Sequence, residues 1–139
     1  MVKLAPSSEQ YAALLKTMER FNEACNYISQ LAFEHHTASQ VMLHHLAYRY
    51  LREHYGLSAQ MAVRVVGKVV EQYRRDKSRL HIFKPRSAMV YDSRILAFKG
   101  LDKISILTLR GRLIIPIRIG EYQAVRMNTV VKETDLILR

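Results

Sequence analysis

The chain has 139 residues, the size of one ordinary domain, and its 49% hydrophobic and 24% charged residues exclude a disordered protein. One cysteine excludes an internal disulfide, and no apolar run is long enough for a signal peptide or a membrane span, so we expect a cytoplasmic protein with no membrane partner. The net charge of +10 is concentrated, because residues 64–112 carry 13 Lys and Arg against 4 Asp and Glu, whereas residues 1–63 carry 5 against 5. Such an excess is typical of proteins that bind a polyanion, and a solvated basic surface is the alternative.

The first predicted element is a long helix near residues 8–35. Ser7 and Gln10 have the spacing of a capping box, in which each side chain bonds the backbone of the other residue at a helix start. Seven apolar residues follow at alternating steps of three and four, which predicts one buried face made of Tyr11, Leu14, Met18, Phe21, Cys25, Ile28 and Ala32. Because Cys25 lies on this face, we expect a core residue and not a nucleophile.

Two shorter helices are predicted next. The first lies near residues 40–55, and its expected inward residues are Leu43, Leu46, Ala47 and Tyr50. The second has Ser58 as its N-cap and runs to about residue 76, with the inward residues Ala62, Val65, Val66, Val69 and Tyr73. Its opposite face is polar and basic and consists of Gln60, Arg64, Lys68, Gln72 and Arg75.

Short β-type runs follow from residue 80 onward, at residues 82–83, 89–91, 95–98 and 135–138. Two longer runs, 104–109 and 113–119, flank Arg110-Gly111-Arg112 and predict a hairpin with a short loop. Pro116 has no backbone N–H to donate, so its strand is expected at a sheet edge or a bulge. Residues 3–5 could add a first strand to this β part. The late strand at 135–138 leads us to expect further natural chain beyond residue 139.

The sequence predicts no catalytic, metal or cofactor site. The six histidines lack the spacing of two ligands on one helix face, so we expect them at the surface or at loop ends: His35, His36, His44, His45, His54 and His81. The five glycines are too scattered for a phosphate-binding loop, and the acidic residues are too isolated for two-metal nuclease chemistry. We therefore expect a protein that is not an enzyme.

Cations and aromatic rings lie close together in the sequence around the end of the third predicted helix and just after it. They occur in Tyr73-Arg74-Arg75-Asp76-Lys77-Ser78-Arg79 and in Phe83-Lys84-Pro85-Arg86. Lys and Arg neutralise phosphates, and exposed rings can stack on unpaired bases. Tyr73 and Phe83 are equally consistent with core packing.

Six blocks of sequence, spread in order over the chain, carry a family resemblance. They are Lys3-Leu4-Ala5-Pro6 with Glu9-Gln10, Phe21-Asn22-Glu23-Ala24-Cys25-Asn26-Tyr27-Ile28-Ser29, Tyr50-Leu51-Arg52, Leu57-Ser58-Ala59-Gln60-Met61-Ala62, Tyr91-Asp92-Ser93-Arg94-Ile95-Leu96, and Gly111-Arg112 with Ile119-Gly120-Glu121-Tyr122. Together they resemble the N-terminal part of the TnpB (OrfB) family, the transposon-encoded RNA-guided DNA nucleases related to type V CRISPR effectors.

The resemblance extends the α+β fold that helices followed by strands predict. It implies a three-helix recognition lobe inserted into, or packed beside, a small antiparallel β-barrel, the oligonucleotide-binding-like wedge. Residues 1–7 would form the first wedge strand, residues 8–79 the helical recognition lobe and residues 80–139 the β-barrel wedge lobe. In the family, the RuvC-like nuclease domain and its zinc ribbon follow this region, so the resemblance implies binding without catalysis.

The predicted function is a nucleic-acid-binding module of an RNA-guided DNA-targeting protein. Its partners would be guide RNA, target DNA and a separate nuclease-domain polypeptide; the alternative is a small DNA-binding transcriptional regulator or transposon accessory protein without RNA guidance. The candidate contact residues are Gln60, Arg64, Lys68, Arg74, Arg75, Lys77, Arg79, Lys84, Arg86, Tyr91 and Arg94. We expect Gln60, Arg64 and Lys68 to read duplex DNA, because Gln suits an adenine edge and Arg or Lys suits guanine or phosphate.

Overall fold

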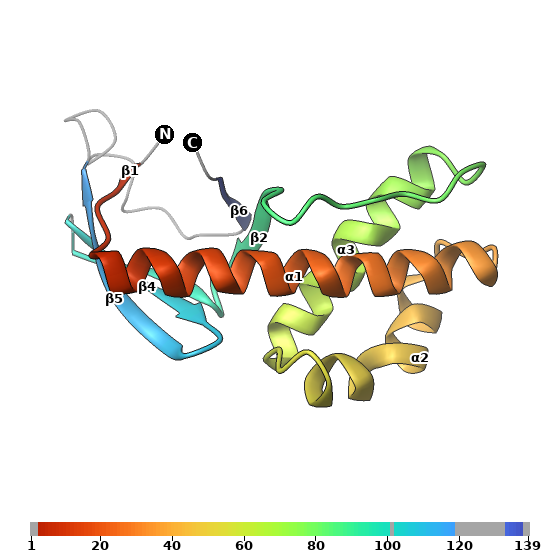
Figure 1. Cartoon of the computed structure of the whole chain (residues 1–139), viewed down its shortest axis with the longest axis horizontal. Coiled ribbons are helices and arrows are strands. Elements are labelled where there is room, and N and C mark those ends of the chain that lie inside the picture. Colours follow the sequence, from red (N-terminus) through yellow and green to blue (C-terminus); the bar gives the residue numbers. More distant parts are fainter. Residues whose placement is uncertain (1–2, 101, 119–132, 138–139) are drawn as a thin grey trace.

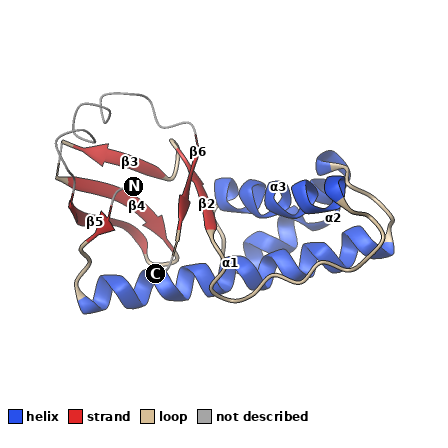
Figure 2. Cartoon of the chain, turned by 90° about the horizontal axis from the view of Figure 1, so that it is seen from above, coloured by secondary structure: helices blue, strands red, loops and turns tan. Residues whose placement is uncertain are grey.

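The computed structural model describes residues 3–100, 102–118 and 133–137, and it has an α+β fold (Figures 1 and 2). Its helices are α1 (Ser8–Glu34), α2 (Gln40–Glu53) and α3 (Ala59–Arg75). Its strands are β1 (Lys3–Leu4), β2 (Met89–Asp92), β3 (Leu96–Lys99), β4 (Lys103–Thr108), β5 (Gly111–Arg118) and β6 (Glu133–Leu136). No helix within these ranges is long and apolar enough to cross a membrane.

Helix α1 runs along the whole molecule and joins its two parts. Figures 1 and 2 show the strands beside its N-terminal half and the other two helices beside its C-terminal half. At the strand end, the Gln10 amide donates to the Ile114 carbonyl at 2.9 Å, and the Leu109 N–H donates to Thr17 Oγ1 at 3.1 Å. The buried residues of helices and strands form one continuous core cluster, so the two parts share their apolar interior.

The predicted start and buried face of α1 are confirmed, with one exception. Ser7 and Gln10 form the capping box, and the buried face contains all the expected residues from Leu14 onward. Cys25 is among them, and burial raises the pKa of its thiol to about 12, as suits a core residue. The inward position predicted for Tyr11 is wrong: its side chain is 44% exposed. At this end Gln10 and Leu14 face the sheet, and Tyr11 points about 100° away from Gln10.

Helix α2 is rotated relative to the prediction. Leu43 and Ala47 are buried as expected, whereas Leu46 and Tyr50 are 47% and 40% exposed. Leu51 is buried in their place, so the inward row steps by four. A 3-4 apolar pattern allowed either choice, and packing against α1 and α3 selects the row with Leu51.

Helix α3 follows the prediction closely. Ser58 is its N-cap and accepts the Met61 N–H, and all five residues expected to point inward are buried. Helix α3 packs against both α1 and α2, which explains why its apolar face is the most sharply defined of the three.

The strands form an antiparallel four-stranded sheet in the order β1-β5-β4-β3, and β2 pairs with β6 in a separate antiparallel ladder. The predicted first strand is thus confirmed, since Lys3 pairs with Arg118. Within the described ranges the strands do not close into a barrel. The strand predictions at residues 119 and 138, and the block at residues 119–122, lie outside those ranges.

The β4–β5 hairpin is confirmed, but its turn begins one residue earlier than predicted and is one residue shorter. Thr108 pairs with Gly111, so the turn contains Leu109 and Arg110, and Arg112 belongs to the strand. Gly111 has a φ of +95°, a backbone conformation that favours glycine and is typical of short hairpin loops. The edge or bulge expected for Pro116 is not found, because β5 is an inner strand. Pro116 lies where the short β1 ends, and its carbonyl accepts the Ala5 N–H at 2.8 Å.

Candidate nucleic-acid interface

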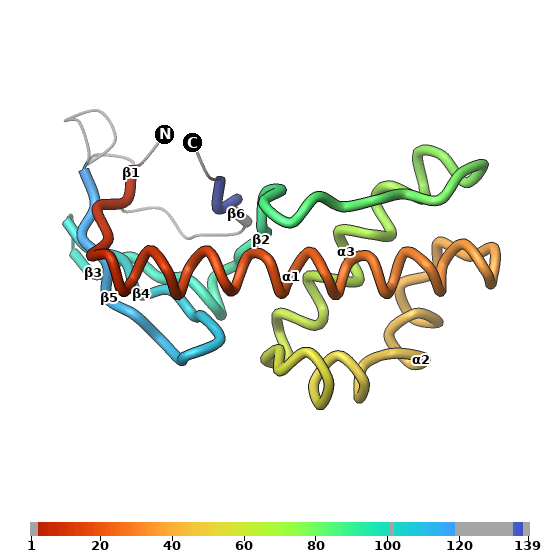
Figure 3. Tube along the Cα trace, in the orientation of Figure 1, coloured from red at the N-terminus to blue at the C-terminus, as the bar shows by residue number. Residues whose placement is uncertain are grey.

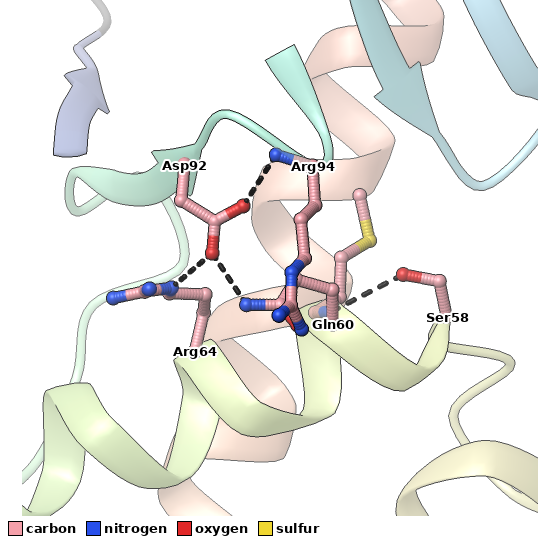
Figure 4. Close-up of polar contacts among 6 residues, drawn as sticks. Ser58, Gln60, Arg64, Asp92 and Arg94 are labelled. Carbon is pink, nitrogen blue, oxygen red and sulfur yellow. Dashed lines mark hydrogen bonds and ion pairs between the residues drawn. The ribbon is translucent and has the colours of Figure 1, made fainter. Parts of the chain in front are cut away.

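The first two residues of the predicted DNA-reading face are bound within the protein. Asp92, at the end of β2, is buried, and its carboxylate accepts hydrogen bonds from the Gln60 amide and from Arg64 Nε at 2.8 Å (Figure 4). The Arg94 backbone N–H donates to the other carboxylate oxygen at 2.9 Å, and its guanidinium donates to Gln60 Oε1 at 3.0 Å. This network joins α3 to the turn between β2 and β3.

The environment of Asp92 favours its charged form. Burial alone would raise the pKa of this carboxyl, but hydrogen bonds from the Arg94 N–H, Gln60 and Arg64, together with the Arg64 charge, outweigh burial and lower it. Asp92 is therefore an anion beneath a basic surface. It keeps Arg64 and Gln60 turned toward β2.

Lys68, the third residue of that face, is also bound internally. Its ammonium donates to Asn22 Oδ1 at 2.9 Å, Ser87 Oγ at 2.6 Å and the Ala88 carbonyl at 2.6 Å, which uses all three of its N–H donors. Burial lowers the pKa of this amine. The structure thus gives Lys68 a role inside the fold, and contact with DNA would require these bonds to break.

The segment from residue 80 to 88 lies against α1 without forming a strand, so the β-run predicted at 82–83 is wrong. Figure 3 shows this segment leaving the end of α3 and running beside α1 toward β2. Side chains of α1 satisfy its backbone: Asn26 exchanges two hydrogen bonds with Phe83, at 2.9 and 2.7 Å, and Ser29 Oγ donates to the His81 carbonyl at 2.5 Å. The helix side chains thus take the place of a neighbouring strand.

The aromatic rings considered for base stacking belong to the core. Tyr73 and Phe83 are buried, and the Tyr73 hydroxyl donates to the Ser29 carbonyl at 3.0 Å. Tyr91 is fully buried, burial raises the pKa of its phenol, and its hydroxyl donates to the Leu107 carbonyl at 2.9 Å. The structure therefore corrects the inclusion of Tyr91 among the contact residues, because a ring without exposed surface cannot stack on a base.

The remaining cations of the basic stretch lie at the surface. Of the 13 Lys and Arg residues between 64 and 112, all except Arg64 and Lys68 are exposed. Arg75 pairs with Glu71 and Arg79 with Asp76, at 2.8 and 3.2 Å. Seven others make no side-chain hydrogen bond or ion pair with any residue that the structure describes: Arg74, Lys77, Lys84, Arg86, Lys99, Lys103 and Arg110.

In the described ranges, no three His, Cys, Asp or Glu side chains come together as metal ligands. His35, His36, His45 and His54 are exposed and His44 is half-buried, which agrees with the surface placement expected for them. His81 is the exception: it is buried, and its ring N–H donates to the Asp76 carbonyl at 2.6 Å. It fixes the loop after α3 instead of facing solvent.

Sequence reasoning missed the polar residues that build this region from within. Asn22, Asn26 and Ser29 are spaced by four and three, so they share one side of α1, each next to a residue of its apolar face. The signal for them that the sequence offered was a row of polar residues at helical spacing next to the buried face of the helix.

Neither a protein-family model nor a curated protein matches the sequence.

Proposed function

We propose that this chain is the nucleic-acid-binding module of a cytoplasmic RNA-guided DNA-targeting protein related to the TnpB family, and that it has no nuclease activity of its own. The observation that carries the proposal is the dense set of exposed cations between residues 64 and 112. Phosphate neutralisation by such cations releases counterions and is the main source of affinity for nucleic acid. The family assignment, the guide RNA and the oligonucleotide-binding-like barrel rest on the sequence resemblance.

Exposure divides the remaining candidate contact residues into two groups, because Gln60, Arg64 and Lys68 are half-buried and the other cations are exposed. Gln60, Arg64 and Lys68 hold α3 against the segments that follow it, so in this proposal they shape the binding surface. The exposed cations contact the phosphates, namely Arg74, Arg75, Lys77, Arg79, Lys84, Arg86 and Arg94. If Gln60 reads a base, its amide must first give up the hydrogen bond to Asp92. Gln60→Ala would then affect folding as well as binding.

Binding should be strongly salt-dependent. If about six phosphates are contacted, affinity for a structured RNA should fall by about 10³ between 50 and 200 mM salt. Replacing both Arg74 and Lys77 by alanine should lower the slope of log K against log salt by about 2, one unit for each lost phosphate contact. The matched control replaces Lys16 and Arg49, which are exposed but lie outside the basic stretch. Equal slopes for both double variants, or affinity that ignores salt, would contradict the proposal.

The nucleic acid that co-purifies with the protein separates RNA guidance from the alternative of a DNA-binding regulator. Sequencing should recover an RNA with a defined end, whereas recovery of DNA alone would favour the regulator. The same preparation, incubated with magnesium, should leave bound DNA and RNA uncut. Cleavage that persists through purification and disappears on mutation of Asp92 or Asp102 would show an active site in this chain.

A further inference from the structure

The turn at residues 84–87 is held from beneath by buried groups. The Ser87 N–H donates to the Lys84 carbonyl at 3.1 Å and closes the turn, and Pro85 restricts the backbone within it. The Asn22 amide, which is fully buried, donates to the carbonyls of Pro85 and Ser87 at 3.1 and 2.9 Å. The backbone of this turn is therefore fixed by its own hydrogen bond and by α1.

Lys68 supports the same turn from α3. It donates to Ser87 Oγ and to the Ala88 carbonyl, both at 2.6 Å, while its ammonium lies 5.7 Å from the ring centroid of Phe21 and 5.3 Å from that of Phe83. The Ser87 hydroxyl also donates to Asn22 Oδ1 at 3.2 Å. Two helices thus fix one short turn through a connected set of polar contacts.

The outer side of the turn presents two cations. Lys84, Pro85 and Arg86 are exposed, and neither cation has a hydrogen-bond or ion-pair partner among the residues that the structure describes. A fixed backbone lowers the ordering cost of binding, and two cations on one short turn suit a phosphodiester, which Arg can bind through two parallel bonds. Both cations therefore lie on a loop whose backbone is held by side chains of α1 and α3.

We propose that the turn at residues 84–87 is a preorganised phosphate-binding site for the backbone of the bound RNA, with Lys84 and Arg86 as contact residues and Asn22 as the residue that positions them. This inference rests on the proposed function, since it names where the RNA strand is held. The positioning role distinguishes this turn from the rest of the basic stretch.

The first test compares two double variants in fluorescence anisotropy titrations with a labelled RNA hairpin that carries a single-stranded 3′ tail. Lys84→Ala with Arg86→Ala should weaken binding at least about tenfold and lower the salt slope by about 2. The control, Lys99→Ala with Arg110→Ala, removes two exposed, unpartnered cations of the same stretch and should weaken binding less than about threefold. Equal losses would overturn the assignment of the turn while leaving the proposed function intact. If the wild-type protein binds no RNA, the proposed function fails, and the inference fails with it.

The second test concerns positioning. Asn22→Asp keeps the side-chain shape and the acceptor for Lys68 but removes the amide that donates to Pro85 and Ser87. It should weaken RNA binding, and the Lys84/Arg86 double variant should then cause little further loss, because the cations are no longer held in place. If Asn22→Asp does not fold, Ser87→Ala tests the support of the turn by another route: it removes the hydroxyl that bonds Lys68 and Asn22 Oδ1 and keeps the two carbonyls that accept from the Asn22 amide. Additive losses, in variants whose circular dichroism is unchanged, would show that Asn22 does not position the turn.

Discussion

At the scale of single residues, Asp92 is the group that binds the N-terminal half of the polar face of α3, through Gln60 and Arg64. It is a buried carboxylate that accepts bonds from two side chains of α3 and from the backbone of the following turn. Without its charge, the Arg64 guanidinium, whose side chain is only 29% exposed, would lose its anionic partner. Breaking a partly buried charge pair on one side leaves the other charge without compensation, and this is more costly than losing a surface pair.

Asp92→Asn should therefore lower the free energy of unfolding by about 1–3 kcal/mol at neutral pH, measured by urea denaturation. The change keeps the shape of the side chain and removes only the charge. Asp102→Asn is the matched control, because Asp102 is exposed, and it should change the free energy of unfolding by less than about 0.5 kcal/mol. Similar values for the two variants would mean that the Asp92 network contributes little to stability.

Asp92 also makes the free energy of unfolding depend on pH. The folded pKa of Asp92 lies below its ordinary value of 3.8, so its contribution is present above that value and is lost as the pH falls through the folded pKa. We expect wild-type stability to decline below about pH 5, and the decline to be shallower in Asp92→Asn. A remaining slope is expected in the variant, because hydrogen bonds from Ser78 lower the pKa of Asp76 to about 2.

At the scale of elements, the orientation of α2 shows how packing chooses between two faces that the sequence leaves open. Leu43, Ala47 and Leu51 point into the core, while Leu46 and Tyr50 point outward. The exposed Tyr50 ring stacks on His54 with centroids 4.6 Å apart and lies 4.5 Å from the ring of Tyr27. These ring contacts cover part of the apolar surface that the helix leaves outside the core.

Two leucines on α2 test this orientation. Leu51→Ala should destabilise the protein by about 2–5 kcal/mol, because it leaves a cavity in the core, whereas Leu46→Ala should cost less than about 1 kcal/mol. Both substitutions remove the same atoms from the same helix, so helix propensity cancels in the comparison. The midpoint of chemical denaturation provides the measurement. A larger loss of stability in Leu46→Ala than in Leu51→Ala would place Leu46 in the core.

At the scale of the whole molecule, α1 makes the helical and strand parts depend on each other. One core cluster includes residues from all three helices and from strands β2 to β5, and the segment at residues 80–88 is bonded to α1 along its path. The described parts of residues 8–79 and 80–139, predicted as separate lobes, therefore share one long helix, α1, as their common support. Loss of either part exposes the apolar side of the other.

We expect the chain to unfold in one cooperative transition. The calorimetric enthalpy should equal the van't Hoff enthalpy, and the helix signal in circular dichroism should change together with the near-ultraviolet signal of the buried Tyr91. Two resolved transitions would show instead that the helical and strand parts are independent units.

The sequence by itself determined the helices, the hairpin and the basic character of the central stretch. Local signals suffice for these features, because a capping box, a 3-4 apolar step and paired β-runs depend on residues close together in the chain. They predicted the start of α1 and the inward face of α3 correctly. The first strand at residues 3–5 was also predicted, and it pairs with β5 far along the chain.

Only the tertiary structure decided which polar side chains are free to bind a partner. Gln60, Arg64 and Lys68 lie on the polar face that the helical period predicts, yet Asp92, Asn22 and Ser87 approach from distant parts of the chain and occupy their donors. Helical periodicity shows that side chains share a face, but it does not show what packs against that face. The exposed cations at residues 84–86 became a candidate site for the same reason, because buried groups of α1 and α3 fix their backbone.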